Sequence, residues 1–130
     1  MRLLHAARLA KNQTGPATED QEARAWAERN GDEIVAVAAD KLSGRVSPFD
    51  RPNLGPWLTD PALMSRYDGI IVYQVDRLSR GRDWNIRAWA EAEGKKLIVV
   101  NPELVWPPAP GDTATPIVWD ALVGQRPWDE

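Results

Sequence analysis

Arginine and aspartate side chains follow three apolar segments of this 130-residue chain, in a pattern that suits the binding of a phosphate group. Arg8 comes at the end of the first apolar segment and Asp40 at the end of the second. Asp76 and Arg77 follow the third, and Arg80 lies on the same side as Arg77 if a helical turn begins there. One guanidinium group can bind two phosphate oxygens at once, and its charge stabilises negative charge that develops on a phosphoryl group. These residues predict a phosphate or phosphodiester site.

The loop after the second apolar segment adds Ser43, Gly44 and Arg51 to this set. A structural interpretation competes with the phosphate site, because arginine and aspartate at strand ends also form ion networks that only hold loops in place. Loops lie at the surface and are charged in most proteins. The spacing alone leaves both interpretations open.

Strands and helices alternate along the chain, and this order determines where the charged residues meet. The apolar segments predict strands over residues 3–9, 34–39, 70–75 and 97–100. Capping residues, prolines and glycines predict helices over 18–30, 52–58, 83–93 and from 115 onward. This order implies an α/β domain in three layers, with a mostly parallel central sheet of four or five strands and helices on both faces. Since ligands bind at the carboxyl ends of parallel strands, the arginines and aspartates should converge on one rim.

The stretch from 101 to 113 holds four prolines and is expected to be a loop. No internal repeat and no second domain is visible in the sequence.

The composition excludes several classes of protein. A net charge of −3 argues against binding of nucleic acid through bulk charge, although the arginines between 76 and 87 form a local basic island. The absence of cysteine excludes disulfides, thiolate zinc sites and a thiol nucleophile. The single histidine, His5, lies in an apolar segment that favours a core position, which argues against a histidine metal site or a Ser-His-Asp triad. No apolar run reaches the ~20 residues that span a bilayer, so we expect a cytoplasmic protein without membrane contact.

Several stretches of the chain match the motifs of a known family. They are Ala7-Arg8-Leu9, the helix start Thr18-Glu19-Asp20-Gln21, and residues 40–44, 51–54 and 67–80, the last of which ends in Asp-Arg-Leu-Ser-Arg. Together they resemble the catalytic domain of serine site-specific recombinases, a family that includes the resolvases and invertases. The likeness is greatest to the large serine integrases of phages and mobile elements. It runs from residue 1 to about 125 as one catalytic domain, with 126–130 as a tail, and the segment 67–80 is its most specific part.

The resemblance implies a resolvase-like fold and a defined reaction on DNA. In the family a serine attacks the scissile phosphate, forms a 5′-phosphoserine bond and releases a 3′ hydroxyl. The resemblance assigns Arg8, Arg51, Arg77 and Arg80 to holding that phosphate. It assigns Asp76 to orienting these arginines or to proton transfer.

The resemblance also implies supporting residues and partners. Asp40 would brace the neighbouring arginines, Ser43 would support its loop, and Gln21 stands where the family has a glutamine. No metal or nucleotide cofactor is implied, because guanidinium groups supply the positive charge and the covalent intermediate conserves bond energy. The implied partners are double-stranded DNA at attachment sites and further copies of the chain in a dimer or tetramer. The resemblance also implies a cytoplasmic protein, encoded by a bacterial host or by a phage.

The chain departs from the family pattern at the nucleophile and at its end. Ala10 occupies the serine position, two residues after Arg8, and alanine cannot attack a phosphate, so we predict no strand cleavage. An engineered change would give an inert catalytic domain. A natural one would mark a homologue acting in oligomerisation or DNA-associated regulation, and the intact arginine set favours the first alternative. Pro127 would interrupt the long helix that leads to the family's DNA-binding domains, so we expect weak DNA binding without them.

Overall fold

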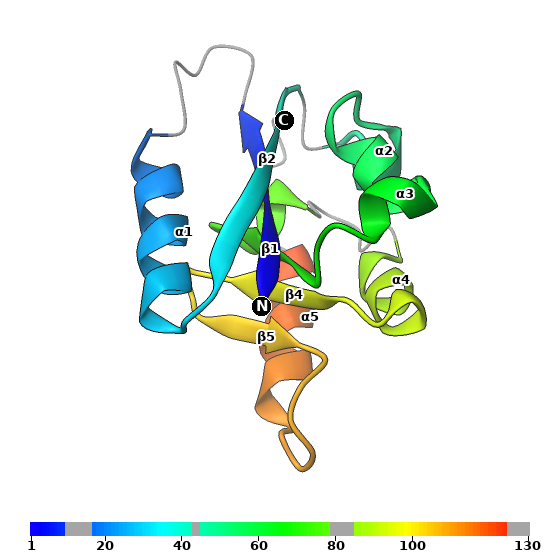
Figure 1. Ribbon diagram of the computed structural model, residues 1–130. Helices are drawn as coiled ribbons and strands as arrows, with labels where there is room; N and C mark the ends of the chain where they lie inside the picture. The colour runs from blue at the N-terminus through cyan, green and yellow to red at the C-terminus, as the bar shows by residue number, and fades with distance from the viewer. Residues whose placement is uncertain (10–16, 43–44, 79–84, 125–130) are drawn as a thin grey trace.

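A five-stranded sheet in the order β2-β1-β3-β4-β5 forms the centre of the computed structural model, which describes residues 1–9, 17–42, 45–78 and 85–124 (Figure 1). The strands are β1 (Arg2–Leu9), β2 (Glu33–Lys41), β3 (Gly69–Val72), β4 (Lys96–Val99) and β5 (Leu104–Trp106). The first four are parallel, and β5 is antiparallel to β4. The predicted α/β fold, with a mostly parallel sheet and helices on both faces, is confirmed.

In the described residues, five helices and two 3-10 turns accompany the strands. They are α1 (Ala17–Arg29), η1 (Pro48–Asp50), α2 (Leu54–Thr59), α3 (Pro61–Met64), η2 (Val75–Arg77), α4 (Ile86–Glu93) and α5 (Ala114–Gly124). Helix α1 packs on one face of the sheet through Ala23, Trp26 and Ala27, against Leu3 of β1. Helices α2, α4 and α5 pack on the other face.

The alternation of side chains along the strands separates these two cores. Leu3 of β1 belongs to the core under α1, whereas Leu4 belongs to the core under α2, α4 and α5. All four residues of β3 are buried, as expected for a central strand that is covered on both faces. Trp119 of α5 is fully buried in the larger core.

One expected loop contains a strand, and one expected strand ends earlier than predicted. Residues 104–106 form β5 inside the stretch that was expected to be a loop, because Leu104 and Trp106 pair with Val99 and Leu97 of β4. The third strand ends at Val72 rather than at 75, and residues 75–77 form η2. The expected helix over 52–58 is present as α2, which is followed at once by α3.

Helix α2 lies unusually close to η1, and Gly55 permits this approach. A Cβ atom at position 55 would lie 2.6 Å from the carbonyl oxygen of Phe49. The Gly55 N–H group donates to the carbonyl oxygen of Arg51 at 2.8 Å. The turn, Arg51 and the start of α2 therefore form one packed unit beside the carboxyl end of β2.

Candidate active site

The carboxyl ends of β1, β2 and β3 bring several of the expected site residues together. Arg8 of β1 lies beside Asp40 of β2 in the parallel register. The Arg8 side chain is 3% exposed, and its guanidinium group donates to the carbonyl oxygens of Asp76 and Leu42, both at 3.3 Å. Arg8 therefore joins the segment that follows β2 to the one that follows β3.

Arg51 reaches the same rim from the turn before α2. Its guanidinium group is 1% exposed and donates to the carbonyl oxygens of Arg77, of Leu78 (3.2 Å) and of Val46 (3.4 Å). Burial, with the nearby charge of Arg8 as a smaller cause, lowers the pKa of Arg51 to about 10. In this structure the Arg51 fork holds the backbone at the end of η2.

Arg77 is paired with Glu19 of α1, the helix that covers the face of the sheet opposite to α2, α4 and α5. Its Nε and Nη2 atoms donate to the two oxygens of Glu19 at 2.9 and 2.7 Å, and Nη1 donates to Asp76 at 3.2 Å. The Arg77 and Glu19 side chains are only 12% and 13% exposed. Burial lowers the pKa of Arg77, but the Glu19 hydrogen bonds and the two carboxylate charges outweigh it, so the pKa is raised.

Glu19 was not expected to be a partner of Arg77, because its position in the sequence indicated only the first turn of a helix. A usable signal exists, because the amino end of a helix that follows a parallel strand lies at the same rim as the carboxyl end of that strand. An acidic residue in that first turn can therefore reach an arginine that follows a neighbouring strand.

Asp40 has partners other than those expected. Its two carboxylate oxygens accept hydrogen bonds from the backbone N–H groups of Asn53 (2.8 Å) and Leu54 (3.0 Å). These groups lie at the amino end of α2, where backbone donors have no partner within the helix. Its charge still favours the protonated form of Arg51. Asp40 thus fixes α2, and with it Arg51, to the end of β2.

His5 lies under the amino end of α1, close to Asp20 in its first turn. This is the core position that its apolar neighbours in the sequence favoured. The ring is 1% exposed, and Nδ1 lies 3.6 Å from the Asp20 carboxylate. Asp20 also accepts from Arg24 at 2.9 Å. Burial lowers the pKa of His5, against the opposing influence of the Asp20 and Glu19 charges.

The other expected site residues are not part of this described cluster. Gln21 is exposed on α1. Ala10, Ser43 and Arg80 lie outside the described residues. In the described ranges, no group of three or more His, Asp or Glu side chains is arranged to hold a metal ion. The same ranges contain no helix with the length and apolar character needed to cross a bilayer.

The rim has the chemistry of an anion site that is occupied by the protein's own carboxylates. Glu19 presents two oxygens to the Arg77 fork, which is the arrangement that two phosphate oxygens would also adopt. A phosphodiester can be held here if it replaces Glu19 at Arg77. The two buried guanidinium groups of Arg8 and Arg51 then place additional positive charge behind it.

The family model described as "Resolvase, N terminal domain" matches residues 6–122. A search of curated proteins found no match.

Three solved structures share the fold. The N-terminal catalytic domain of TP901-1 integrase has 18% identity and a TM-score of 0.71, over 94% of this chain and 91% of that one. The C-terminal catalytic domain of ISC1926 TnpA, an IS607-like serine recombinase, has 22% identity and a TM-score of 0.66, over 77% and 70%. A resolvase family site-specific recombinase from Streptococcus pneumoniae has 15% identity and a TM-score of 0.63, over 93% and 84%.

Proposed function

The chain belongs to the resolvase family, and from this premise we propose that it is the catalytic domain of a serine site-specific DNA recombinase whose cleavage step is blocked at Ala10. The family rearranges DNA, and the fold is that of serine recombinase catalytic domains. Alanine in the nucleophile position has no side-chain oxygen that could form the 5′-phosphoserine bond. The expected outcome is a bound phosphodiester that stays intact.

The convergence of Arg8, Arg51 and Arg77 at one rim carries this proposal. Three guanidinium groups from separate parts of the chain meet where three parallel strands end, although the overall charge is negative. In the proposed site Arg77 and Arg80 hold the scissile phosphate, with Arg8 and Arg51 behind them. Asp76, which pairs with Arg77, orients that guanidinium group or takes part in proton transfer.

The proposed partners follow from the same assignment. They are double-stranded DNA at attachment sites and further copies of the chain in a dimer or tetramer, in the bacterial cytoplasm. Asp40 and Ser43 support the rim, and Gln21 acts from α1.

A second candidate is a domain that keeps the recombinase fold for oligomerisation or DNA-associated regulation. The bidentate contact between Arg77 and Glu19 favours it, because that contact occupies the arginine that would hold the phosphate. The alanine at position 10 fits this candidate equally well.

A domain exchange distinguishes the two candidates. Residues 1–124 would replace the catalytic domain of an active large serine integrase, with either Ala10 or Ala10→Ser, and the chimeras would be incubated with that integrase's supercoiled attachment-site DNA. We expect a covalent protein–DNA adduct on a denaturing gel with Ala10→Ser and none with Ala10. The matched control combines Ala10→Ser with Arg77→Gln and should lose the adduct.

Two results would contradict the proposal. An adduct formed by the Ala10 chimera would show that cleavage is not blocked. A folded, DNA-bound Ala10→Ser chimera without adduct would favour the regulatory candidate.

A further inference from the structure

The edge strand of the sheet ends in an exposed lysine at the same rim as the arginines. Strand β2 lies at the edge, beside β1, and its last residue, Lys41, pairs with Leu9 of β1. Figure 1 looks onto this edge, with α1 on one side of β2 and α2 and α3 on the other. The Lys41 side chain is exposed where the carboxyl end of β2 meets solvent.

Lys41 lies on the same face of the sheet as the pair formed by Arg77 and Glu19. Successive side chains of a strand point to opposite faces. Asp40 points toward α2, because its carboxylate accepts hydrogen bonds from backbone N–H groups at the amino end of that helix. Lys41 therefore points to the α1 face. Glu19, which binds Arg77, stands in the first turn of α1.

Arg8 fixes the backbone next to both cations. Its guanidinium group donates to the carbonyl oxygen of Leu42, the residue after Lys41, and to that of Asp76, the residue before Arg77, both at 3.3 Å. Because one buried side chain binds both segments, their relative position is fixed. β1 alone separates β2 from β3, so these two strands lie about 10 Å apart.

The charge of Lys41 has no partner in the part of the chain that the structure describes. Three exposed cations in this part make no hydrogen bond, ion pair or ring contact: Arg29, Lys41 and Lys96. Arg29 ends α1 and Lys96 begins β4, so both lie at the opposite end of the sheet, where the parallel strands begin. Lys41 is the member of this group that lies at the arginine rim.

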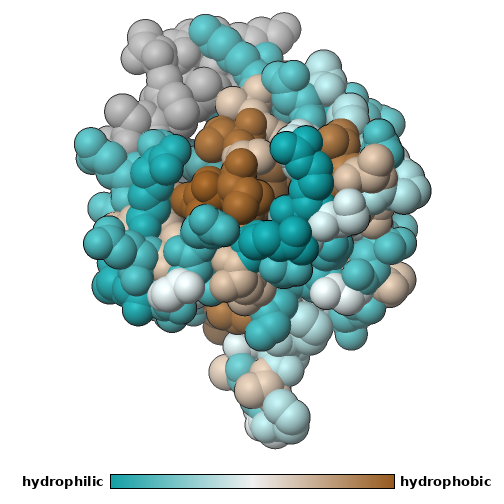
Figure 2. Space-filling model, viewed as in Figure 1, coloured by the Kyte–Doolittle hydropathy of each residue, from teal (hydrophilic) through white to brown (hydrophobic). Residues whose placement is uncertain are grey.

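The rest of the β2 edge does not suit a phosphate backbone. Val35 and Val37 are 40% and 46% exposed. Figure 2, in the view of Figure 1, shows hydrophobic surface over the middle of this edge and hydrophilic surface around it. Phosphates are bound by cations, so a contact between DNA and β2 is confined to the end of the strand.

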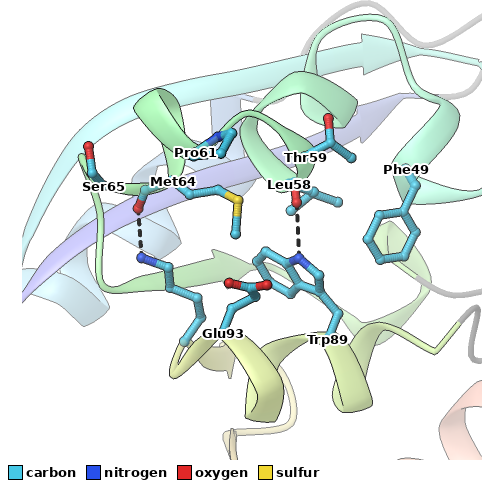
Figure 3. A pocket seen from close by; sticks show the side chains of 9 residues that line it. Phe49, Leu58, Thr59, Pro61, Met64, Ser65, Trp89 and Glu93 are labelled. Carbon is cyan, nitrogen blue, oxygen red and sulfur yellow. Dashed lines mark hydrogen bonds between the residues drawn. The ribbon is translucent and has the colours of Figure 1, made fainter.

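A pocket between α2, α3 and α4 offers no alternative position for a phosphate. It has a volume of about 420 Å³, and Trp89, Glu93 and Lys95 contribute to its lining. The Lys95 ammonium group donates to the carbonyl oxygens of Met64 and Tyr67, both at 2.6 Å. Figure 3 shows the Glu93 carboxylate beside Trp89 in the same space. The cation of this pocket is therefore bound internally, and its carboxylate would repel a phosphate.

We propose that Lys41 binds a second phosphate of the DNA strand whose scissile phosphate is held at Arg77. The strand then crosses the rim from β3 over β1 and leaves the molecule at the β2 edge. One DNA strand carries a phosphate for about every 3.4 Å of helix axis, so the spacing of about 10 Å corresponds to about three nucleotides or fewer. This inference rests on the proposed function, because it names a further contact with the same DNA.

Single charge changes test this contact in the chain itself with a short DNA duplex. We expect Lys41→Gln to weaken binding in anisotropy titrations. The slope of the logarithm of the binding constant against the logarithm of salt concentration should become shallower by about 1, the value for one phosphate. Lys41→Arg keeps the charge and should bind as the original chain does. The matched control is Lys96→Gln, which changes the net charge equally at the opposite end of the sheet and should leave the slope unchanged.

The outcomes separate this inference from the proposed function. A slope that changes with Arg77→Gln but not with Lys41→Gln overturns the role of Lys41 alone. Slopes that change with neither variant contradict the phosphate site of the proposed function as well. Equal losses of slope in Lys41→Gln and Lys96→Gln would show an effect of net charge and would also overturn the role of Lys41. Thermal unfolding confirms that each variant is folded.

Neutral phosphates locate the contact along the DNA strand. In the Ala10 chimera, single methylphosphonate groups would replace the phosphates on either side of the scissile one in the attachment site. We expect one position, at most about three nucleotides away, to weaken binding of the chimera. The same replacement should have no effect on the chimera with Lys41→Gln, whereas the chimera with Lys96→Gln should keep the sensitivity. A Lys41→Gln chimera that is as sensitive as the original at every position would overturn the proposal.

Discussion

Glu19 imitates, with two carboxylate oxygens, the anion that Arg77 is proposed to bind. The contact is bidentate and largely shielded from water, so a phosphodiester competes with an internal ligand. Any phosphate that enters the site must therefore displace Glu19 from Arg77. The affinity of this site for a phosphate group therefore depends on Glu19 as well as on the arginines.

Replacing the internal ligand should strengthen binding. We expect Glu19→Gln to raise the affinity for a short DNA duplex about tenfold, because a charged competitor worth about 1.5–3 kcal/mol is replaced by a neutral one. Fluorescence anisotropy at low salt measures the change. Glu22→Gln, exposed on the same helix, is the control for the charge alone. Equal effects of the two variants would show that Glu19 acts through net charge and not by occupying Arg77.

Arg51 should be far more important for stability than an exposed arginine. Its fork joins three backbone carbonyl groups in a buried position, and lysine cannot reproduce that geometry. We expect Arg51→Lys to lower the free energy of unfolding by about 2–4 kcal/mol. Arg29→Lys, exposed at the end of α1, should change it by less than about 0.5 kcal/mol. Urea denaturation compares the two, and a change below about 1 kcal/mol for Arg51→Lys would contradict the structural role of the fork.

At the scale of elements, the contact between α1 and β1 includes one buried histidine, whose pKa is lowered by burial. His5 of β1 is buried against Asp20 of α1, and its pKa is lowered below the ordinary 6.5. The unfolded chain therefore binds the His5 proton more tightly than the folded chain does. The contribution of His5 to the free energy of unfolding is therefore complete above pH 6.5 and is lost as the pH falls below that value.

His5→Leu should remove this dependence. We expect the urea midpoint of the original chain to fall between pH 7 and pH 5, and the midpoint of His5→Leu to fall less over the same range. The difference between the two curves isolates His5 from the carboxylates, which both proteins share. Parallel curves would mean that His5 does not contribute.

The sequence was informative about elements whose signal is local. Four strands were evident as apolar segments, although β2 lies at the edge of the sheet and is half exposed rather than buried. The convergence of Arg8, Asp40, Asp76 and Arg77 followed from their positions at strand ends. β5 was missed because three residues between prolines become a strand only by pairing with β4. The partners of Arg77 and Asp40 were missed for a related reason: both are contacts between segments distant in the sequence, and residue spacing does not reveal them.

For the whole molecule, the distribution of charge limits how DNA can be held. The net charge is −3, and of the three described rim arginines two are almost fully buried and the third is paired with Glu19. This arrangement suits one phosphate rather than a long stretch of duplex.

Salt dependence measures this limit. We expect the logarithm of the binding constant to fall with the logarithm of salt concentration with a slope of about −1 to −2, corresponding to one or two phosphates. Anisotropy titrations between about 50 and 200 mM salt give the slope, with Arg77→Gln as the variant that should reduce it. A slope near about −6 would indicate an extended basic surface that the rim does not account for.

The close approach at Gly55 makes a position without charge or functional group important for the site. Its N–H group binds the carbonyl of Arg51, and Arg51 holds the end of η2, where Arg77 is placed. A single added methyl group at position 55 would meet the Phe49 carbonyl and displace the packed unit that carries Arg51. Tolerance to substitution at this position of α2 is therefore governed by side-chain volume. Random mutagenesis of the Ala10→Ser chimera, scored by formation of the covalent DNA adduct, should find position 55 among the sites that accept no replacement.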